Sequence, residues 1–191
     1  MSGRGVLFLV VGPSGAGKDT LIDGASLLLA DELSIRFQRR VITRPADAGG
    51  EDHIACTLPE FEDAEMAGAF MLSWRAHGLG YGIQMEASEA LASGTSVVIN
   101  VSRTVIDDSR ARFQPLRVVS IAAEPEMLRA RLRARGRENL EVVEDRVRRA
   151  AAYSVEGPDV DLIVNDADIA SGVARLVAVI RTSVAAHSAS G

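Results

Sequence analysis

A glycine-rich segment near the amino terminus constrains the fold more than any other feature of this chain. It reads Gly12-Pro13-Ser14-Gly15-Ala16-Gly17-Lys18-Asp19-Thr20 and directly follows the apolar run 6–11. The spacing GxxxxGK between an apolar strand and a helical pattern over 18–30 is typical of a loop that binds phosphate groups, because backbone N–H groups turn inward and the helix adds its positive end. The other interpretation is a glycine-rich turn in which Lys18 occurs by chance. The sequence favours the first: these nine residues bind a nucleoside triphosphate, and Lys18 reaches its β- and γ-phosphates.

The alternation of apolar runs with helical patterns predicts an α/β fold, with a mostly parallel central sheet flanked by helices. Expected strands cover Val6–Val11, Ile35–Ile42, Phe70–Ala76, Ser96–Val101, Leu116–Ala122 and Asp161–Val164. Expected helices cover Lys18–Ala30, Pro59–Ala67, Met85–Ala92, Arg103–Arg110, Glu124–Arg135, Glu141–Tyr153 and Ile169–Ala186. A length of 191 residues fits one domain over 1–191.

Composition limits the partners. The net charge of −5 argues against nucleic acid and membrane surfaces as partners, and no apolar stretch is expected to reach the length of a bilayer span. Cys56 is the one cysteine, so no intramolecular disulfide is expected, and the chain has no secretory pattern. We expect a cytoplasmic monomer or homodimer. Arginines gather at 36–44 and 129–149, which favours a small anionic ligand unless they only form a solvated face.

Two segments interrupt the alternation. Residues 43–57 contain a proline, two adjacent glycines and scattered charges, and they are long for a connection between a strand and a helix. Residues 135–139 place a glycine between two arginines inside an otherwise helical pattern. Long loops in compact domains are often functional. In an enzyme that transfers phosphate, the first suits an acceptor-binding region over about 36–95, and the second an arginine-rich lid over about 131–149.

Several motifs together resemble the guanylate-kinase branch of the nucleoside-monophosphate kinases, and within it the ribose 1,5-bisphosphate phosphokinases. They are the phosphate loop, Val41-Ile42-Thr43-Arg44, Gly50-Glu51-Asp52-His53-Ile54-Ala55, the segment 72–82 with Ser73-Trp74 and Tyr81-Gly82, Arg135-Gly136-Arg137-Glu138-Asn139, and Asn165-Asp166. The resemblance covers nearly the whole chain. It implies a P-loop kinase fold with an acceptor-binding insertion and an arginine-rich lid, ATP as phosphoryl donor, and Mg²⁺.

Departures from the guanylate kinases concern the purine. Those enzymes carry a Glu where this chain has Ser73, an Asp-x-Asp where it has Asn100-Val101-Ser102, and a serine at the position of Arg40. Guanine presents N–H donors, and losing charge-assisted bonds to a buried base costs roughly 1.5–3 kcal/mol each. An added guanidinium suits a second phosphate. We therefore expect a sugar bisphosphate rather than GMP at an acceptor site that includes Arg40, Ser73 and Ser102.

Other parts of the acceptor motif are retained. The resemblance implies phosphate contacts for Arg44 and Tyr81, while His53 replaces another such contact and Asp47 stands where the family has a second arginine. The alternatives are that Arg44 only ends a strand and that Tyr81 belongs to the core, as Trp74 is expected to do.

The reaction expected from this resemblance transfers the γ-phosphoryl of ATP to a phosphate that is already ionised at neutral pH, so no general base is needed. The catalytic candidates are Lys18 and the lid residues Arg131, Arg135 and Arg146, with Arg137 and Arg149 nearby. For each lid arginine the alternative is pairing with Glu138, Glu141 or Glu144.

The metal site departs from the usual loop, because Asp19 and then Thr20 follow the lysine and Asn100 replaces the usual carboxylate. We expect Asp19, partly through water, and Thr20 to hold Mg²⁺; the alternative is that Asp19 caps a helix. Two further functions stay open. One is a guanylate kinase with relaxed base recognition, and the other is an inactive guanylate-kinase-like module that binds proteins, against which the presence of Lys18 and Arg135 argues.

Overall fold

The computed structural model describes residues 3–48, 51–134, 140–151, 154–166 and 168–189. Its central sheet has five strands in the order β2-β7-β1-β8-β9, and all four pairings are parallel. The strands are β1 (Leu7–Val11), β2 (Ile35–Phe37), β7 (Ser96–Asn100), β8 (Leu116–Ala122) and β9 (Val160–Val164). The prediction of a parallel central sheet is confirmed.

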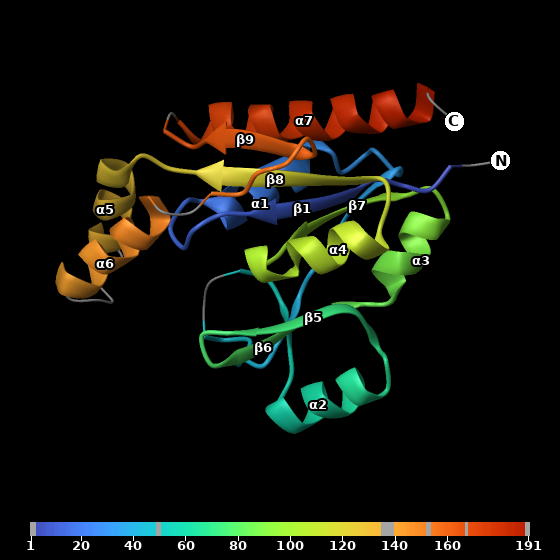
Figure 1. Ribbon diagram of the computed structural model, residues 1–191, viewed down its shortest axis with the longest axis horizontal. Helices are drawn as coiled ribbons and strands as arrows, with labels where there is room; N and C mark the ends of the chain where they lie inside the picture. Colours follow the sequence, from blue (N-terminus) through green and yellow to red (C-terminus); the bar gives the residue numbers. More distant parts are fainter. Residues whose placement is uncertain (1–2, 49–50, 135–139, 152–153, 167, 190–191) are drawn as a thin grey trace.

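Helices cover both faces of this sheet because side chains alternate along the fully buried strand β1. Leu7, Leu9 and Val11 belong to one cluster of buried residues, and Phe8 and Val10 belong to the other. The first face packs against α3 (Glu86–Ala92), η1 (Arg103–Val105) and α4 (Ile106–Arg112). The second packs against α1 (Lys18–Leu28) and α7 (Ile169–Ala189), as Figure 1 shows. The prediction of flanking helices is confirmed too.

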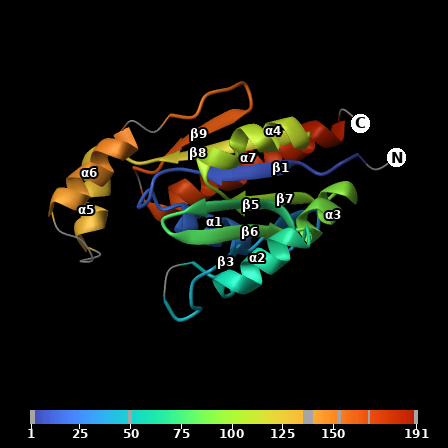
Figure 2. The same ribbon diagram turned by 60° about the horizontal axis from the view of Figure 1, so that its bottom comes forward.

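A second, smaller sheet lies below the first in Figure 1 and is seen from another side in Figure 2. Its order is β4-β3-β6-β5, from β3 (Val41–Ile42), β4 (Ile54–Ala55), β5 (Phe70–Ala76) and β6 (Leu79–Gln84). Helix α2 (Leu58–Met66) starts with a capping box between Thr57 and Glu60, and its Phe61 is fully buried. This unit makes up the region between β2 and α3.

The prediction of one strand over Ile35–Ile42 is wrong. The chain leaves the central sheet after Phe37 and enters the second sheet at Val41, so the segment forms two short strands in different sheets. Residues 35–42 are apolar or basic apart from Gln38 and contain no glycine or proline, so the sequence carries no sign of this change. The sequence analysis also missed β4 and β6. Strand β4 has only two residues, and β6 contains Gly80 and Gly82, which weaken a strand pattern.

Helices α5 (Pro125–Ala134) and α6 (Leu140–Ala151) project from one end of the molecule, beyond the carboxyl end of β8 (Figures 1 and 2). They bury a small cluster of their own, formed by Leu128, Leu132, Val143 and Val147. Arg129 also forms a bidentate ion pair with Glu144, at 2.7 and 2.9 Å. The predicted lid is therefore a helix pair with its own apolar contacts. Residues 135–139 and 152–153, on which the expected helix ends fall, lie outside the described residues.

The expectation that no apolar stretch reaches the length of a membrane span needs correction. Helix α7 has 21 residues and a mean hydropathy of 1.5 in its most apolar window, which suffices by length and composition alone. In the structure, Leu176 and Ile180 of this helix are fully buried against α1 and the central sheet. Core helices of soluble proteins have the same composition.

Candidate active site

The phosphate loop joins the end of β1 to the start of α1, and two of its glycines are required by their surroundings. Gly12 has a φ of 152°, and a Cβ atom there would lie 2.2 Å from the carbonyl oxygen of Ile121. Gly17 has a φ of 91°, and its Cβ atom would lie 2.4 Å from the side-chain nitrogen of Asn165. The loop is thus held against β8 and the end of β9 so closely that side chains at either position would displace it.

Lys18 is folded onto the loop. Its ammonium group donates to the carbonyl oxygens of Gly12 and Pro13, at 2.8 and 3.1 Å. These carbonyls hold the cation at the mouth of the loop, where a bound phosphate would offer it a charged acceptor instead. Figure 1 places this turn between β1 and α1, at the carboxyl edge of the central sheet, where ligands bind in open α/β folds.

Asp19 and Asn100 meet across the carboxyl edge of the sheet, although 81 residues separate them. The Asn100 side chain donates to Asp19 Oδ1 at 2.8 Å. Asn100 is only 8% exposed, and its own Oδ1 is buried without a partner among the described residues. Thr20 is exposed in the same first turn of α1. Carboxylate, amide and hydroxyl oxygens suit Mg²⁺, which keeps several waters. The described residues form no cluster of three His, Cys, Asp or Glu side chains that could hold a metal ion.

Arg131, on α5, lies against the backbone of the loop. It donates to the carbonyl oxygens of Ala16 at 3.4 Å and of Asn165 at 3.2 Å. The buried side chain of Asn165 donates to the same Ala16 carbonyl at 2.7 Å. Two donors therefore fix the Ala16–Gly17 peptide from outside the loop. Arg131 was expected near the phosphates, whereas Asn165 had no predicted role. Their contacts with the Ala16 carbonyl link helix α5 directly to the phosphate loop.

Arg44 and His53 lie together at the ends of the loop that connects β3 and β4. The two ring nitrogens of His53 lie 3.0 Å from the carbonyl oxygen of Glu51 and 3.1 Å from that of Arg44. Arg44 Nη2 lies 3.4 Å from His53 Nδ1, while Arg44 Nε is buried without a partner among the described residues. Buried donors are rarely left unpaired, and an anionic ligand is the natural partner for a guanidinium.

Arg40, Tyr81 and Trp74 form a stack beside this pair. The rings of Trp74 and Tyr81 are 5.3 Å apart and nearly parallel, and the Arg40 guanidinium lies 5.1 Å from the centre of the Tyr81 ring. Arg40 is also bound by Glu51 through two hydrogen bonds. Tyr81 is therefore part of a stack that orients the Arg40 guanidinium. It is partly buried, and its contact with a phosphate stays a prediction. The alternative that Trp74 belongs to the core is confirmed by its 7% exposure.

The three side chains that replace base-reading acidic residues are all engaged within the protein. Asn100 binds Asp19. Ser102 caps η1 and accepts from Thr104. Ser73 donates to Glu65, and bonds from Arg75 and then Ser73 lower the pKa of that carboxyl. At the positions where guanylate kinases bind the purine, this protein therefore has polar side chains that already have partners.

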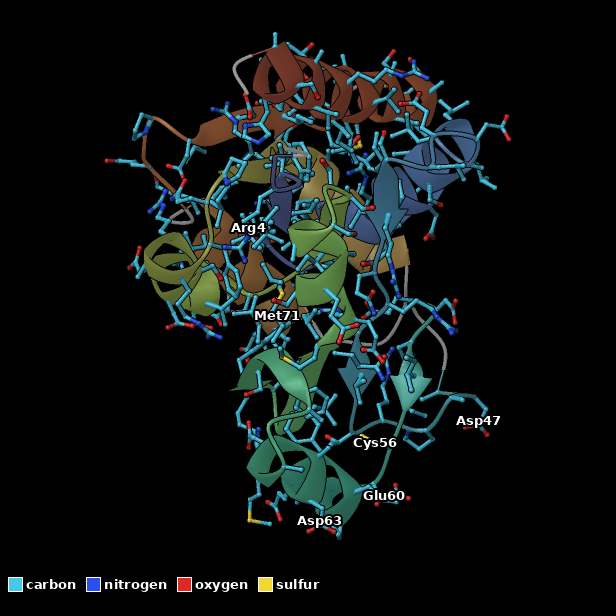
Figure 3. The ribbon with its side chains drawn as sticks, turned by 90° about the vertical axis from the view of Figure 1, so that its right-hand side faces the viewer. Arg4, Asp47, Cys56, Glu60, Asp63 and Met71 are labelled. Atoms are coloured by element: carbon cyan, nitrogen blue, oxygen red, sulfur yellow. The ribbon has the colours of Figure 1, made fainter. Side chains whose placement is uncertain are left out.

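Two further positions lie away from these groups. Asp47, which stands where the family has an arginine, is exposed at the outer end of its loop in Figure 3. Cys56 lies beside the second sheet in the same view, and burial together with the charge of Glu60 raises the pKa of its thiol. Neither position contributes a cation or a reactive thiolate.

A cavity of about 420 Å³ lies along α1 beside the edge of the central sheet. Its lining includes Asp19 and Asn100 together with Arg40 and Glu51, but not Arg44, His53 or Tyr81. Asp23 also lines it, and burial followed by the charges of neighbouring carboxylates raises its pKa. The volume lies within the range of small-molecule sites.

The structure thus brings together two groups of predicted residues: the loop with Arg131, and Arg40 with Arg44, His53 and Tyr81. It does not bring Ser73 or Ser102 into contact with either group through a described hydrogen bond. Arg135 and Arg137 lie outside the described residues, as do the side chains of Arg146 and Arg149. Glu51, Asp23 and Asn165 were not predicted as site residues. Glu51 and Asn165 occur within the motifs that carry the resemblance, so these motifs could have indicated them.

Comparison with known proteins identifies the family to which the chain belongs. The sequence matches the family described as guanylate kinase over residues 4–183. It is 48% identical to ribose 1,5-bisphosphate phosphokinase PhnN of Rhodopseudomonas palustris, over 84% of this chain and 80% of that protein. It is 45% identical to the protein of the same name from Chromobacterium violaceum, over 87% of this chain and 88% of that protein.

Two more matches place the chain in a wider setting. A bifunctional ribose 1,5-bisphosphokinase-thymidine phosphorylase from Roseobacter denitrificans is 44% identical over 91% of this chain, which spans only 26% of that protein's length. The crystal structure of guanylate kinase from Anaplasma phagocytophilum has a TM-score of 0.67 at 20% identity, covering 95% of this chain and 87% of that one, so it supports the fold alone. The chain belongs to the guanylate kinase family, among its members named ribose 1,5-bisphosphate phosphokinase.

Proposed function

We propose that this protein transfers the γ-phosphoryl group of ATP to the 1-phosphate of ribose 1,5-bisphosphate, which gives 5-phosphoribosyl 1-diphosphate and ADP. An oxygen of the 1-phosphate forms a bond to the γ-phosphorus, and the bond between that phosphorus and the β–γ bridging oxygen breaks. The attacking oxygen is already ionised at neutral pH, so no side chain has to remove a proton. The protein has to position the two phosphates and neutralise their charge.

The observation that carries the proposal is the chemistry of the acceptor side. The Arg44 guanidinium lies there, and its Nε is a buried donor that lacks a described partner, whereas Arg40 is paired with Glu51. The side chains at the base-reading positions bind other residues of the protein instead. A ligand with phosphates and no purine fits both facts. The same names among relatives that are 41–48% identical support this choice.

On the donor side, we assign the triphosphate to the phosphate loop, with Lys18 moving from the Gly12 and Pro13 carbonyls to the β- and γ-phosphates. When bound, Mg²⁺ would neutralise charge on the β- and γ-phosphates, and Asp19, Asn100 and Thr20 are the residues that would hold it through water. Arg131 keeps the loop in shape from the lid side. We expect the α5–α6 pair to close over the bound phosphates and exclude water.

A panel assay tests the assignment. The protein is incubated with MgATP and each of ribose 1,5-bisphosphate, ribose 5-phosphate, GMP and AMP, and ADP release is followed while phosphorus NMR identifies the product. We expect turnover with the bisphosphate, a product with a diphosphate group on carbon 1, and at least a hundredfold lower kcat/KM with GMP, as the loss of charge-assisted bonds to a base implies. Equal or better turnover of GMP would identify a guanylate kinase instead. A lack of ADP release with every acceptor would favour a binding module.

A further inference from the structure

Arg40 and Glu51 form a closely matched pair in the lining of the cavity. Arg40 Nε donates to Glu51 Oε2 at 2.9 Å, and Nη2 donates to Oε1. The two side chains are only 13% and 16% exposed. Two parallel bonds fix both the plane and the direction of each group. The pair is thus a rigid part of the cavity wall, and the Tyr81 ring lies 5.1 Å from the Arg40 guanidinium.

Each member of the pair keeps hydrogen-bonding capacity. A carboxylate has about four acceptor sites and a guanidinium has five N–H donors, and the pair uses two of each. The part of the chain that the structure describes offers no further partner to the Glu51 carboxylate. Glu51 can therefore accept from a ligand without releasing Arg40. A ligand that only carries phosphate gains nothing from it, since two anions repel each other.

The cavity itself is rich in acceptors. Its lining includes the carboxylates of Asp19, Asp23, Glu51 and Asp52, against the guanidinium groups of Arg39 and Arg40. Burial, followed by the charges of Asp19, Asp52 and Glu51, raises the pKa of Asp23, as expected where acidic groups crowd together. Walls of this kind favour a ligand that donates hydrogen bonds. The hydroxyl groups of a sugar are such donors.

Glu51 also lies next to the group that we assign to a phosphate. Its carbonyl oxygen is 3.0 Å from His53 Nδ1, and that nitrogen is 3.4 Å from Arg44. A ligand that places a phosphate at Arg44 therefore has its neighbouring atoms near Glu51. In a pentose phosphate, these are the ring and its hydroxyl groups.

We propose that Glu51 determines sugar specificity by accepting a hydrogen bond from one of the vicinal ring hydroxyls of the acceptor, while its bonds to Arg40 hold it in place. This inference rests on the proposed function, because it assumes a phosphorylated pentose as the acceptor. It assigns Arg40 a different part from the one expected from sequence: the guanidinium orients the carboxylate and is not a free cation that awaits the second phosphate.

The test compares ribose 1,5-bisphosphate with its 2-deoxy and 3-deoxy analogues, for the wild-type protein and for Glu51→Gln. In the wild type, removal of the hydroxyl that Glu51 reads should lower kcat/KM roughly ten- to hundredfold, the usual effect of a lost bond to a charged group. The quantity compared is the ratio of kcat/KM for ribose 1,5-bisphosphate to kcat/KM for the deoxy analogue. In Glu51→Gln this ratio should fall at least about fivefold, because the charge that strengthened the bond is gone. Glu62→Gln is the matched control: it is the same exchange at an exposed position of α2 that does not line the cavity, and it should leave the ratio unchanged.

The ratio between sugars separates specificity from a general effect on the fold. A variant that is only less stable loses activity with all three sugars alike, so an unchanged ratio in Glu51→Gln overturns the inference. A lower KM for all three sugars would also overturn it, because Glu51 would then be a competitor that blocks Arg40. So would a change confined to the Mg²⁺ dependence. If the wild type turns over none of the three sugars, the proposed function fails as well, whereas normal turnover with an unchanged ratio removes this inference alone.

Discussion

Arg44 is the side chain whose surroundings most clearly call for a ligand, since its Nε is buried without a described partner. We expect Arg44→Met to lower kcat/KM for ribose 1,5-bisphosphate at least about a hundredfold, because a buried bond between a guanidinium and a phosphate is lost. The KM for ATP should change by less than about threefold, because we assign ATP to the phosphate loop, whereas Arg44 lies against His53 in the loop after β3. Steady-state kinetics measure both. Arg36→Met, on the exposed side of edge strand β2, is the control and should behave like the wild type.

Asn100 and Asp19 allow a test of how the loop tolerates charge. In Asn100→Asp, two carboxylates would face each other where a 2.8 Å hydrogen bond now lies, and this raises the pKa of one of them in the folded state. Without Mg²⁺, we expect a loss of about 1–3 kcal/mol in the free energy of unfolding at pH 7.5. Because the folded-state pKa is raised, this loss should shrink as the pH falls and one carboxyl takes up a proton.

Thermal unfolding with and without Mg²⁺, at pH 7.5 and pH 4.5, measures the effect. Mg²⁺ should restore much of the loss, since a cation between two carboxylates removes their repulsion. The double variant Asp19→Asn/Asn100→Asp exchanges the two groups and should recover most of the wild-type stability. A Tm of Asn100→Asp that equals that of the wild type under all conditions would show that the two side chains do not face each other.

At the scale of elements, α4 and the segment before β9 are joined by Arg110 and Asp159. Arg110 donates to both oxygens of Asp159, each at 2.9 Å. Burial alone would raise the pKa of Asp159, but the bonds from Arg110 outweigh it, and the pKa lies below its usual value. The pair therefore stabilises the fold above the ordinary pKa of an aspartate, and this contribution disappears as the pH falls through the lower, folded-state value.

Asp159→Asn should accordingly lower the free energy of unfolding by about 1–2 kcal/mol at pH 7. The difference from the wild type should narrow as the pH falls below the ordinary pKa of an aspartate, and it should vanish below the lower folded-state pKa of Asp159. Urea unfolding across this pH range measures it. Asp107→Asn is the control, because Asp107 contacts the same arginine at 3.3 Å but is 95% exposed, and it should have no measurable effect.

The elements also show where the sequence was informative. The strand, loop and helix over 7–28 were predictable, since one contiguous motif defines them. The second sheet was not, because β3 and β4 have two residues each, and β4 pairs with β3, which in turn pairs with β6. The Arg40–Glu51 and Asp19–Asn100 pairs join residues 11 and 81 positions apart, and no local pattern records such contacts. Residue types were predictable at the site; their partners were not.

At the scale of the whole molecule, three units surround the site: the central sheet, the second sheet with α2, and the α5–α6 pair (Figure 2). The α5–α6 pair buries an apolar cluster of its own, so it can move as a body about the central sheet, whereas Met71, Leu72 and Ile83 of the second sheet share one core with β1 and β7. We expect small-angle X-ray scattering to show a smaller radius of gyration when a non-hydrolysable ATP analogue and ribose 1,5-bisphosphate are both present. Either ligand alone should have a smaller effect. An unchanged radius with both ligands would argue against closure.

The stack of Trp74, Tyr81 and Arg40 has a practical consequence. Trp74 is the only tryptophan in the chain, and it lies one ring away from the guanidinium at the acceptor side. Any ligand that shifts that cation changes the electrostatic field felt by a single indole. The intrinsic emission of the unlabelled protein thus becomes an optical gauge of acceptor occupancy, free of background from other indoles and usable in rapid mixing as well as at equilibrium.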